Sequence, residues 1–228
     1  MTDVVTFLAG SPLFSACTER SLRHISGGAR QERYRDHEVI FRQGDPGERC
    51  FVIAEGVVKV SVVSLGGAEM LLATLGPLES FGELSVIDGG PRSATATALG
   101  PTSTISIERQ ILMEAVAEEP ELADSLFRAL GALARHGTEH ASDVAFLDLA
   151  GRVAKAILEL GARFGHVDGQ EISVTSPLSQ REIGEMVGGS RQSVNHILAT
   201  FERRGWIEVR GRGLRILSLG ELERRADR

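Results

Sequence analysis

The chain has 228 residues, enough for one large domain or two of ordinary size. Hydrophobic residues make up 42% of it, and no uninterrupted apolar run approaches the length of a membrane span, so the composition excludes a membrane protein. The formal net charge of −6 is unevenly divided, with 12 Lys and Arg against 20 Asp and Glu over residues 1–147 and 13 against 11 over residues 148–228. An acidic N-terminal part and a slightly basic C-terminal part favour a C-terminal unit that binds a polyanion.

The N-terminus carries Asp3 and no basic region before its short apolar stretch, which is not typical of a secretory signal. Two cysteines, Cys17 and Cys50, give neither a disulfide framework nor the spacing of metal ligands. We therefore expect inert thiols in a reducing cytoplasm and no bound metal.

Residues 38–107 contain short β-like runs separated by turn signals. The runs are 39–41, 50–54, 57–63, 70–74, 95–99 and 105–107, and the turns are predicted at Gly44-Asp45-Pro46-Gly47, Glu55-Gly56 and Gly66-Gly67. Many short strands with regular turns predict a β-barrel or jelly roll.

The segment from Phe81 to Ala94 gathers several polar groups within a span that should close on itself. A sugar hydroxyl needs an acceptor, which Glu83 supplies. A phosphate needs a cation with fork geometry, which Arg92 supplies, together with donors from the Gly82 backbone and the Ser93 hydroxyl. The segment therefore predicts a pocket for a ribose that carries a phosphate, against the alternative of an ordinary β-turn.

From residue 111 to residue 147 the pattern becomes helical, with an interruption at Glu119-Pro120. Seven positions follow the 4-3-4-3 spacing of a heptad seam, which predicts a parallel coiled coil and hence a homodimer. These are Leu126, Leu130, Leu133, Gly137, His140, Val144 and Leu147. The alternative is one amphipathic helix on the barrel. Gly137 leaves a gap in the seam where a flat ligand could dock.

The residues His136, Glu139 and His140 match the inverted zinc-peptidase motif H-x-x-E-H. A catalytic zinc needs a third protein ligand, and nothing downstream offers an obvious one. We therefore keep a zinc peptidase only as a remote alternative and expect no enzyme activity.

The last third of the chain carries a second pattern. Ser179 and Glu182 form a capping box that opens one short helix, Gly188-Gly189 makes a turn, and Ser190 caps a second helix that ends before Gly205. Two such helices joined through glycine predict a helix-turn-helix. The β-like runs 206–209 and 214–217 flank Arg210-Gly211-Arg212-Gly213, which predicts a wing with two cations at its tip.

Taken together, the Phe81–Ala94 segment and the winged helix-turn-helix resemble those of the Crp/Fnr family of bacterial regulators, over roughly residues 7–219. The resemblance implies an α+β protein with three parts: a cyclic-nucleotide-binding β-roll (jelly roll) over residues 1–120, a dimerisation helix over 121–147 and a winged helix-turn-helix over 148–228. Family members that sense oxygen through an iron–sulfur cluster need four cysteine ligands, so two cysteines exclude that branch.

The resemblance also implies roles for individual residues. Glu83 would hold the ribose 2′-hydroxyl and Arg92 with Ser93 the cyclic phosphate, while Gly82 and Leu84 complete the pocket. Two residues of the dimer helix near the base align with Gly137 and Thr138, of which only Thr138 has a polar side chain. Cyclic AMP is the expected effector.

In the C-terminal unit the resemblance places the second helix in the major groove of double-stranded DNA. Arg191, Gln192 and His196 occupy the positions that read bases. The expected phosphate contacts are Ser179, Gln180, Ser193, Asn195, Arg210 and Arg212.

The sequence thus predicts a cytoplasmic, homodimeric transcription regulator of a pseudo-palindromic operator, with RNA polymerase as a further partner and no membrane association. The alternative within the family is a protein with another effector or with constitutive DNA binding.

Overall fold

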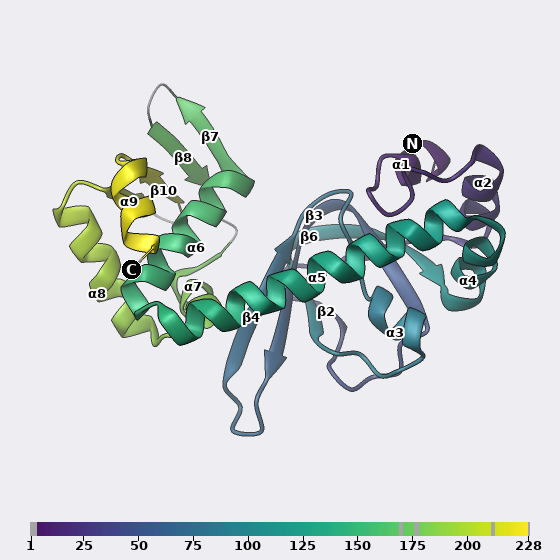
Figure 1. Cartoon of the computed structure of the whole chain (residues 1–228), viewed down its shortest axis with the longest axis horizontal. Coiled ribbons are helices and arrows are strands. Elements are labelled where there is room, and N and C mark those ends of the chain that lie inside the picture. The colour runs from purple at the N-terminus through teal and green to yellow at the C-terminus, as the bar shows by residue number, and fades with distance from the viewer. Residues whose placement is uncertain (1–3, 169–170, 176–177, 211–212, 228) are drawn as a thin grey trace. The chain divides into compact units, whose positions relative to one another are not determined.

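The computed structural model describes residues 4–168, 171–175, 178–210 and 213–227. The chain divides into two compact units, one of residues 1–68 with 72–136 and one of residues 69–71 with 137–228. The division falls within the long helix α5 (Pro120–Phe146). Figure 1 labels the elements of both units.

The N-terminal unit is built on an antiparallel sheet with the strand order β1-β6-β3-β4. β2 also pairs with β6 and β5 with β3. The strands are β1 (Arg30–Tyr34), β2 (Val39–Phe41), β3 (Arg49–Val63), β4 (Glu69–Leu75), β5 (Ser80–Phe81) and β6 (Thr95–Glu108). β6 carries six consecutive buried positions, residues 102–107, near its C-terminal end, which suits a strand covered on both faces.

One predicted turn inside this sheet, at Glu55-Gly56, is wrong, and two further runs that were predicted separately are continuous. The runs 50–54 and 57–63 form one strand, β3, and the runs 95–99 and 105–107 form one strand, β6. Gly56 has a φ of +89° and lies where the β3–β6 register shifts, so it makes a bulge rather than a turn. A Cβ at Gly56 would lie 2.6 Å from the carbonyl oxygen of Pro101, which explains why glycine is needed. The turn at Gly66-Gly67, by contrast, is confirmed between β3 and β4.

Helices α1 (Val4–Ala9), α2 (Glu19–Gly28) and α4 (Arg109–Glu118) gather beside the first turns of α5, as Figure 1 shows. Their apolar faces and the sheet enclose a core that includes Phe14, Ile25, Ile107 and Leu122. Phe41, Phe51 and Phe81 form a second, aromatic cluster, in which the rings of Phe51 and Phe81 stack with their centroids 5.0 Å apart. α1, α2, β1, β5 and the short helix α3 (Glu83–Asp88) were not predicted from the sequence.

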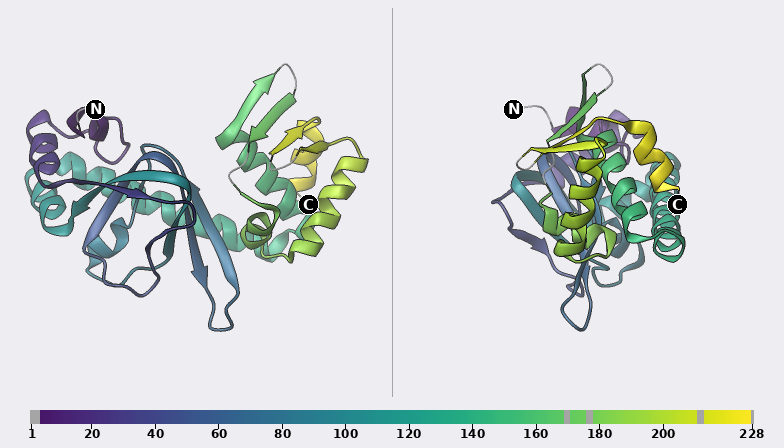
Figure 2. Two further views of the ribbon diagram at one scale, coloured as in Figure 1. Left: turned by 180° about the vertical axis from the view of Figure 1, so that it is seen from behind. Right: turned by 90° about the vertical axis from the view of Figure 1, so that its left-hand side faces the viewer.

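The C-terminal unit contains α6 (Leu149–Phe164), α7 (Gln180–Val187), α8 (Arg191–Arg203) and α9 (Leu219–Ala226). Its sheet has the order β7-β8-β10-β9, made from β7 (Gly165–Asp168), β8 (Glu171–Thr175), β9 (Ile207–Arg210) and β10 (Gly213–Ile216). Figure 2 shows these helices and hairpins from two further directions. α6 buries Val153, Ile157 and Leu160 at helical spacing. α9 packs along α6, and neither α9 nor β7 was predicted.

Candidate functional site

A cavity of about 170 Å³ lies in the N-terminal unit between the sheet, α3 and α5. Polar groups of the β5–α3 corner and of the loop before β6 line it, together with apolar side chains that include Val60, Leu72, Leu75 and Leu133. Of the predicted ligand contacts, Gly82, Glu83, Leu84, Arg92 and Ser93 line this cavity.

The β5–α3 corner depends on glycine. Gly82 precedes α3 with a φ of +78°, and a Cβ there would lie 2.7 Å from Nη1 of Arg92. Gly89, with a φ of +71°, ends the helix after Asp88. The corner therefore turns tightly and brings Glu83 and Ser85 to the side chain of Arg92.

Arg92 is 5% exposed and is held by three acceptors. Nη1 donates to the Gly82 carbonyl oxygen and to Ser85 Oγ, both at 2.8 Å, and Nη2 donates to the Arg49 carbonyl oxygen at 2.7 Å. Burial lowers the pKa of Arg92, while Cys50, Glu83 and other acidic groups oppose this effect. Its Nε is buried and has no hydrogen-bond partner, so this donor is available to a ligand.

Glu83 presents the complementary group. Burial raises the pKa of its carboxyl, and the backbone N–H of Glu83 and the charge of Arg92 oppose that rise. Oε2 of Glu83 is buried without a hydrogen-bond partner. A buried acceptor and a buried cationic donor, both unpaired in one cavity, fit a ligand that has a hydroxyl and an anionic group.

From α5 the cavity is lined by Leu133 and His136. Nε2 of His136 lies 3.1 Å from the carbonyl oxygen of Leu72 on β4. Thr138, the predicted base contact, is exposed and does not line the cavity of the single chain. The sequence pointed to His136 only through the zinc-peptidase motif.

Several contributors to this cavity were missed from the sequence, among them Phe41, Ser85 and His136. Phe41 and Ser85 support Arg92, and His136 lines the cavity from α5. No local motif marks Phe41, because its contact with Arg92 is made across the fold.

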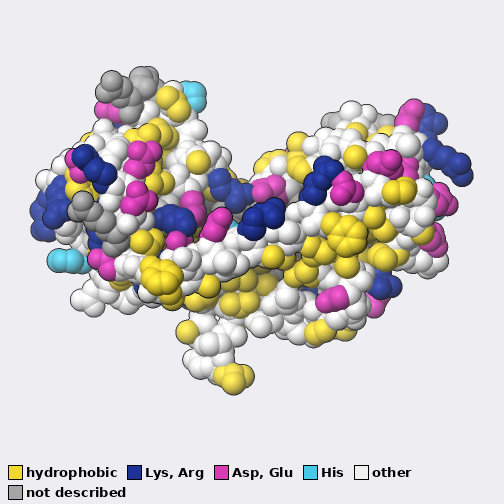
Figure 3. Space-filling view, viewed as in Figure 1, with side chains coloured by type: hydrophobic (Ala, Val, Ile, Leu, Met, Phe, Trp, Pro, Cys, Tyr) yellow, Lys and Arg dark blue, Asp and Glu magenta, His cyan; other side chains and the backbone are white. Residues whose placement is uncertain are grey.

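The predicted dimer seam needs one correction. Leu126 is 5% exposed and belongs to the N-terminal core, because the first turns of α5 are covered by α1, α2 and α4. Farther along α5, Leu133 and Val144 are 44% and 48% exposed, while Leu130, His140 and Leu147 are half-buried. Figure 3 shows hydrophobic side chains along the exposed face of this helix.

A Cβ at Gly137 would meet nothing within 4 Å, so this position of the seam faces open space in the single chain. Phe127, outside the predicted seam, is 70% exposed. The exposed apolar positions of α5 are available to a second chain.

The helix-turn-helix forms as its caps predict. The Ser179 backbone N–H donates to Glu182 Oε2 at 2.7 Å, and the Glu182 N–H donates to Ser179 Oγ at 3.3 Å, which completes the capping box. Gly188 ends α7 with a φ of +65°, and the Ser190 side chain caps α8. α8 buries Val194, Leu198 and Phe201 and turns its other face outward.

The predicted base-reading residues lie on the outer face of α8. Arg191, Gln192 and His196 are exposed, while Ser193 and Asn195 are half-buried. The C-terminal end of α8 is closed by Gly205, which has a φ of +70° and whose N–H donates to the Glu202 carbonyl oxygen. Arg191 and Gln192 thus occupy the first turn of a well-capped helix.

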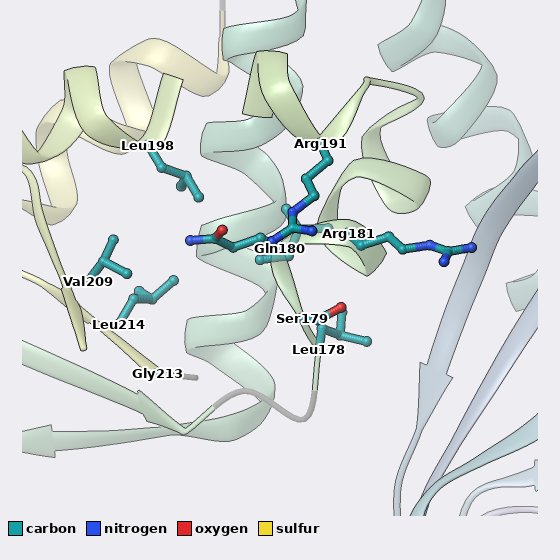
Figure 4. Close-up of a pocket in the computed structure, with 10 residues that line it drawn as sticks. Leu178, Ser179, Gln180, Arg181, Arg191, Leu198, Val209, Gly213 and Leu214 are labelled. Atoms are coloured by element: carbon teal, nitrogen blue, oxygen red, sulfur yellow. The ribbon is translucent and has the colours of Figure 1, made fainter. Parts of the chain in front are cut away.

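A second cavity, of about 450 Å³, lies between α7, α8 and the β9–β10 hairpin. Its apolar wall includes Leu198, Val209 and Leu214. Figure 4 shows the side chains of Arg191 and Gln180 directed toward this hollow and that of Arg181 directed away from it. A groove with these donors at one side and a β-hairpin at the other suits the backbone of a nucleic acid.

The predicted cations of the wing are only partly described. Arg210 is exposed and pairs with Glu208 at 3.0 Å. Gly211 and Arg212 lie outside the described residues. In Figure 3, Lys and Arg side chains of the C-terminal unit are interleaved with Asp and Glu.

The described residues give the zinc-peptidase alternative no third ligand. Within the described ranges, no group of three or more His, Cys, Asp and Glu side chains could hold a metal ion. Cys17 and Cys50 are free thiols, and burial raises the pKa of each to about 12. Among the described helices, none combines the length and the apolar character needed to cross a membrane.

Residues 31–119 match the family model of the cyclic nucleotide-binding domain, and residues 151–225 match that of the Crp-like helix-turn-helix domain. The chain is 41% identical over 188 residues to a CRP-like cAMP-activated global transcriptional regulator of Mycobacterium tuberculosis, covering 82% of this chain and 84% of the relative. It is 29% identical over 202 residues to the cyclic AMP receptor protein of Thermus thermophilus, covering 89% and 90%. FixK2 from Bradyrhizobium japonicum has the same fold, with a TM-score of 0.77, 24% identity, and coverage of 86% of this chain and 96% of that one.

Proposed function

The chain belongs to the Crp/Fnr family of DNA-binding transcription regulators and carries a cyclic nucleotide-binding domain, and we propose that its own effector is cyclic AMP. We propose further that a homodimer holds the two C-terminal units on a pseudo-palindromic operator. The relatives named for activation by cyclic AMP support this choice of nucleotide.

One observation carries the proposal: Glu83 Oε2 and Arg92 Nε are both buried and unpaired in the same cavity. The 2′-hydroxyl of a ribose would donate to Glu83, and the cyclic phosphate would accept from Arg92. Ser93, which is exposed at the cavity, and the backbone at Gly82 would add donors, with Leu84 as an apolar contact. Thr138 remains a proposed contact to the base.

In the C-terminal unit, Arg191, Gln192 and His196 would read base edges from α8 in the major groove. Ser179, Gln180, Ser193, Asn195, Arg210 and Arg212 would contact phosphates. These proposed roles are supported by the exposed first turn of α8 and by the groove beside it.

The proposed division of labour is an effector domain of residues 1–120, a dimerisation helix of residues 121–147 and a DNA-binding domain of residues 148–228. α5 lines the effector cavity with Leu133 and His136 and also carries the proposed dimer seam. Effector binding would shift the equilibrium between two arrangements of the α5 pair, with a coupling of about 1–3 kcal/mol. RNA polymerase is the proposed further partner, in the cytoplasm.

The alternative is a regulator of the same family whose cavity takes another effector or none. Isothermal titration of the purified protein with cyclic AMP and cyclic GMP separates the two. Micromolar binding of cyclic AMP that disappears in Glu83→Ala and Arg92→Ala supports the proposal, provided that circular dichroism shows both variants folded. Binding of neither nucleotide by the wild-type protein would favour the alternative.

A further inference from the structure

Two features of α5 bear on how the base of the nucleotide is recognised. Gly137 has no side chain, and Thr138 does not line the cavity of the single chain. His136, one turn after Leu133, lines the same cavity as Glu83 and Arg92. A ribose phosphate held by the unpaired groups of Glu83 and Arg92 would leave its base to the remaining lining, which includes Leu133 and His136.

The hydrogen bond between His136 and β4 determines which ring nitrogen carries the proton in the neutral imidazole. The carbonyl oxygen of Leu72 can only accept, so Nε2 of His136, at 3.1 Å, is the nitrogen that donates. In the neutral ring the other nitrogen, Nδ1, then carries no proton and is an acceptor.

An acceptor that faces position 6 of a purine distinguishes adenine from guanine. Adenine carries an amino group there, which donates, whereas guanine carries an oxygen, which accepts. An acceptor facing that position is satisfied by adenine and leaves two acceptors opposed with guanine.

We propose that His136 is a base-reading residue of the effector cavity, in which Nε2 is anchored on the Leu72 carbonyl and Nδ1 accepts from the 6-amino group of adenine. The inference rests on the proposed cyclic AMP function. It gives the chain a polar contact to the base within one subunit, next to the position where Gly137 supplies none.

The test compares cyclic AMP with purine riboside 3′,5′-cyclic monophosphate, which lacks only the 6-amino group. Dissociation constants are measured by titration for the wild-type protein, His136→Phe and His136→Lys. Phe keeps the approximate size of the ring without its nitrogens, and Lys keeps a donor for the Leu72 carbonyl but has no acceptor. His24→Phe, at an exposed histidine of α2 outside the cavity, is the matched control.

The wild-type protein and His24→Phe are expected to prefer cyclic AMP about tenfold, which corresponds to about 1.4 kcal/mol and to one hydrogen bond. In His136→Phe and His136→Lys the preference should fall to near unity, because cyclic AMP binding weakens and binding of the analogue does not.

A preference that survives in both His136 variants would overturn the inference. Equal weakening of both nucleotides would also overturn it, since His136 would then only shape the cavity. If the wild-type protein bound neither nucleotide, the proposed function would fail as well. If Arg92→Ala abolished cyclic AMP binding while His136→Phe left it unchanged, the inference would fail and the proposed function would stand.

Discussion

The guanidinium of Arg92 lies over the ring of Phe41, with Cζ 4.1 Å from the ring centroid. Phe41 also packs against Phe51 and Phe81, with ring centroids 5.8 and 5.9 Å away. The ring therefore holds one face of the guanidinium while three acceptors fix its terminal nitrogens. This arrangement pre-organises Arg92 before any ligand binds.

Phe41→Leu should weaken cyclic AMP binding roughly twofold to thirtyfold, because a cation–π contact in a desolvated site contributes about 0.5–2 kcal/mol. Isothermal titration measures the change. Phe7→Leu, which removes a ring from the N-terminal core, is the control and should leave the affinity unaltered. An unchanged affinity in Phe41→Leu would show that the three hydrogen bonds alone position Arg92.

Positions whose chemistry is local could be predicted from the sequence. Gly82, Glu83 and Arg92 lie within a short segment that closes on itself, and the caps at Ser179 and Ser190 are set by residues three positions away. Phe41 and His136 could not be found in this way, because each contacts the site from a distant part of the chain.

Two failures of the sequence analysis have a different cause. A glycine between two apolar runs is equally compatible with a turn and with a bulge, so Gly56 did not reveal that β3 is continuous. The heptad spacing included Leu126, but spacing alone does not show that α1 and α2 cover that end of α5.

Glu119, at the junction of α4 and α5, ties this junction to the start of α2. Its Oε1 accepts from Ser21 Oγ at 2.5 Å, and its Oε2 accepts from the Thr18 N–H at 3.1 Å. Burial acts to raise the pKa of Glu119, but these hydrogen bonds outweigh it and hold the pKa below the ordinary value of 4.5.

Because the pKa is lower in the folded state, the ionised carboxylate stabilises the fold above about pH 4.5, and this contribution disappears as the pH falls through the folded-state pKa. Glu119→Gln should therefore lower the Tm most at pH 7, by the equivalent of about 1–3 kcal/mol, and progressively less toward pH 3.5. Thermal melts across this range test it, with the exposed neighbour Glu118→Gln as control. A Tm difference that is constant with pH would contradict the role of the charge.

Arg225 of α9 pairs with Asp148, the residue whose side chain caps α6 through the N–H of Gly151. The pair joins the last helix of the chain to the first helix of the C-terminal unit. Arg225→Ala should lower the free energy of unfolding by about 0.5–1 kcal/mol, the range of a partly exposed ion pair. Urea denaturation measures it, with Arg224→Ala as the adjacent control. If a double-mutant cycle with Asp148→Asn gave no coupling free energy, the ion pair would not stabilise the folded state.

Arg191 and Arg210 are both exposed cations of the C-terminal unit, and replacing each by alanine should weaken DNA binding in a different way. Arg191 begins α8, so Arg191→Ala should lose about 1–3 kcal/mol on a selected operator and relax discrimination at one base pair. Arg210→Ala, at the wing, should weaken binding evenly across sequences and reduce the slope of log K against log salt by about one.

Fluorescence anisotropy at several salt concentrations distinguishes the two effects on the selected operator and on its single-base variants. Arg210 already pairs with Glu208, so its phosphate contact has an intramolecular competitor, and its loss should be the smaller one. If Arg191→Ala instead weakened every sequence equally and reduced the salt slope, Arg191 would be a phosphate contact. Base reading would then fall to Gln192 and His196, the other exposed residues of the same helix face.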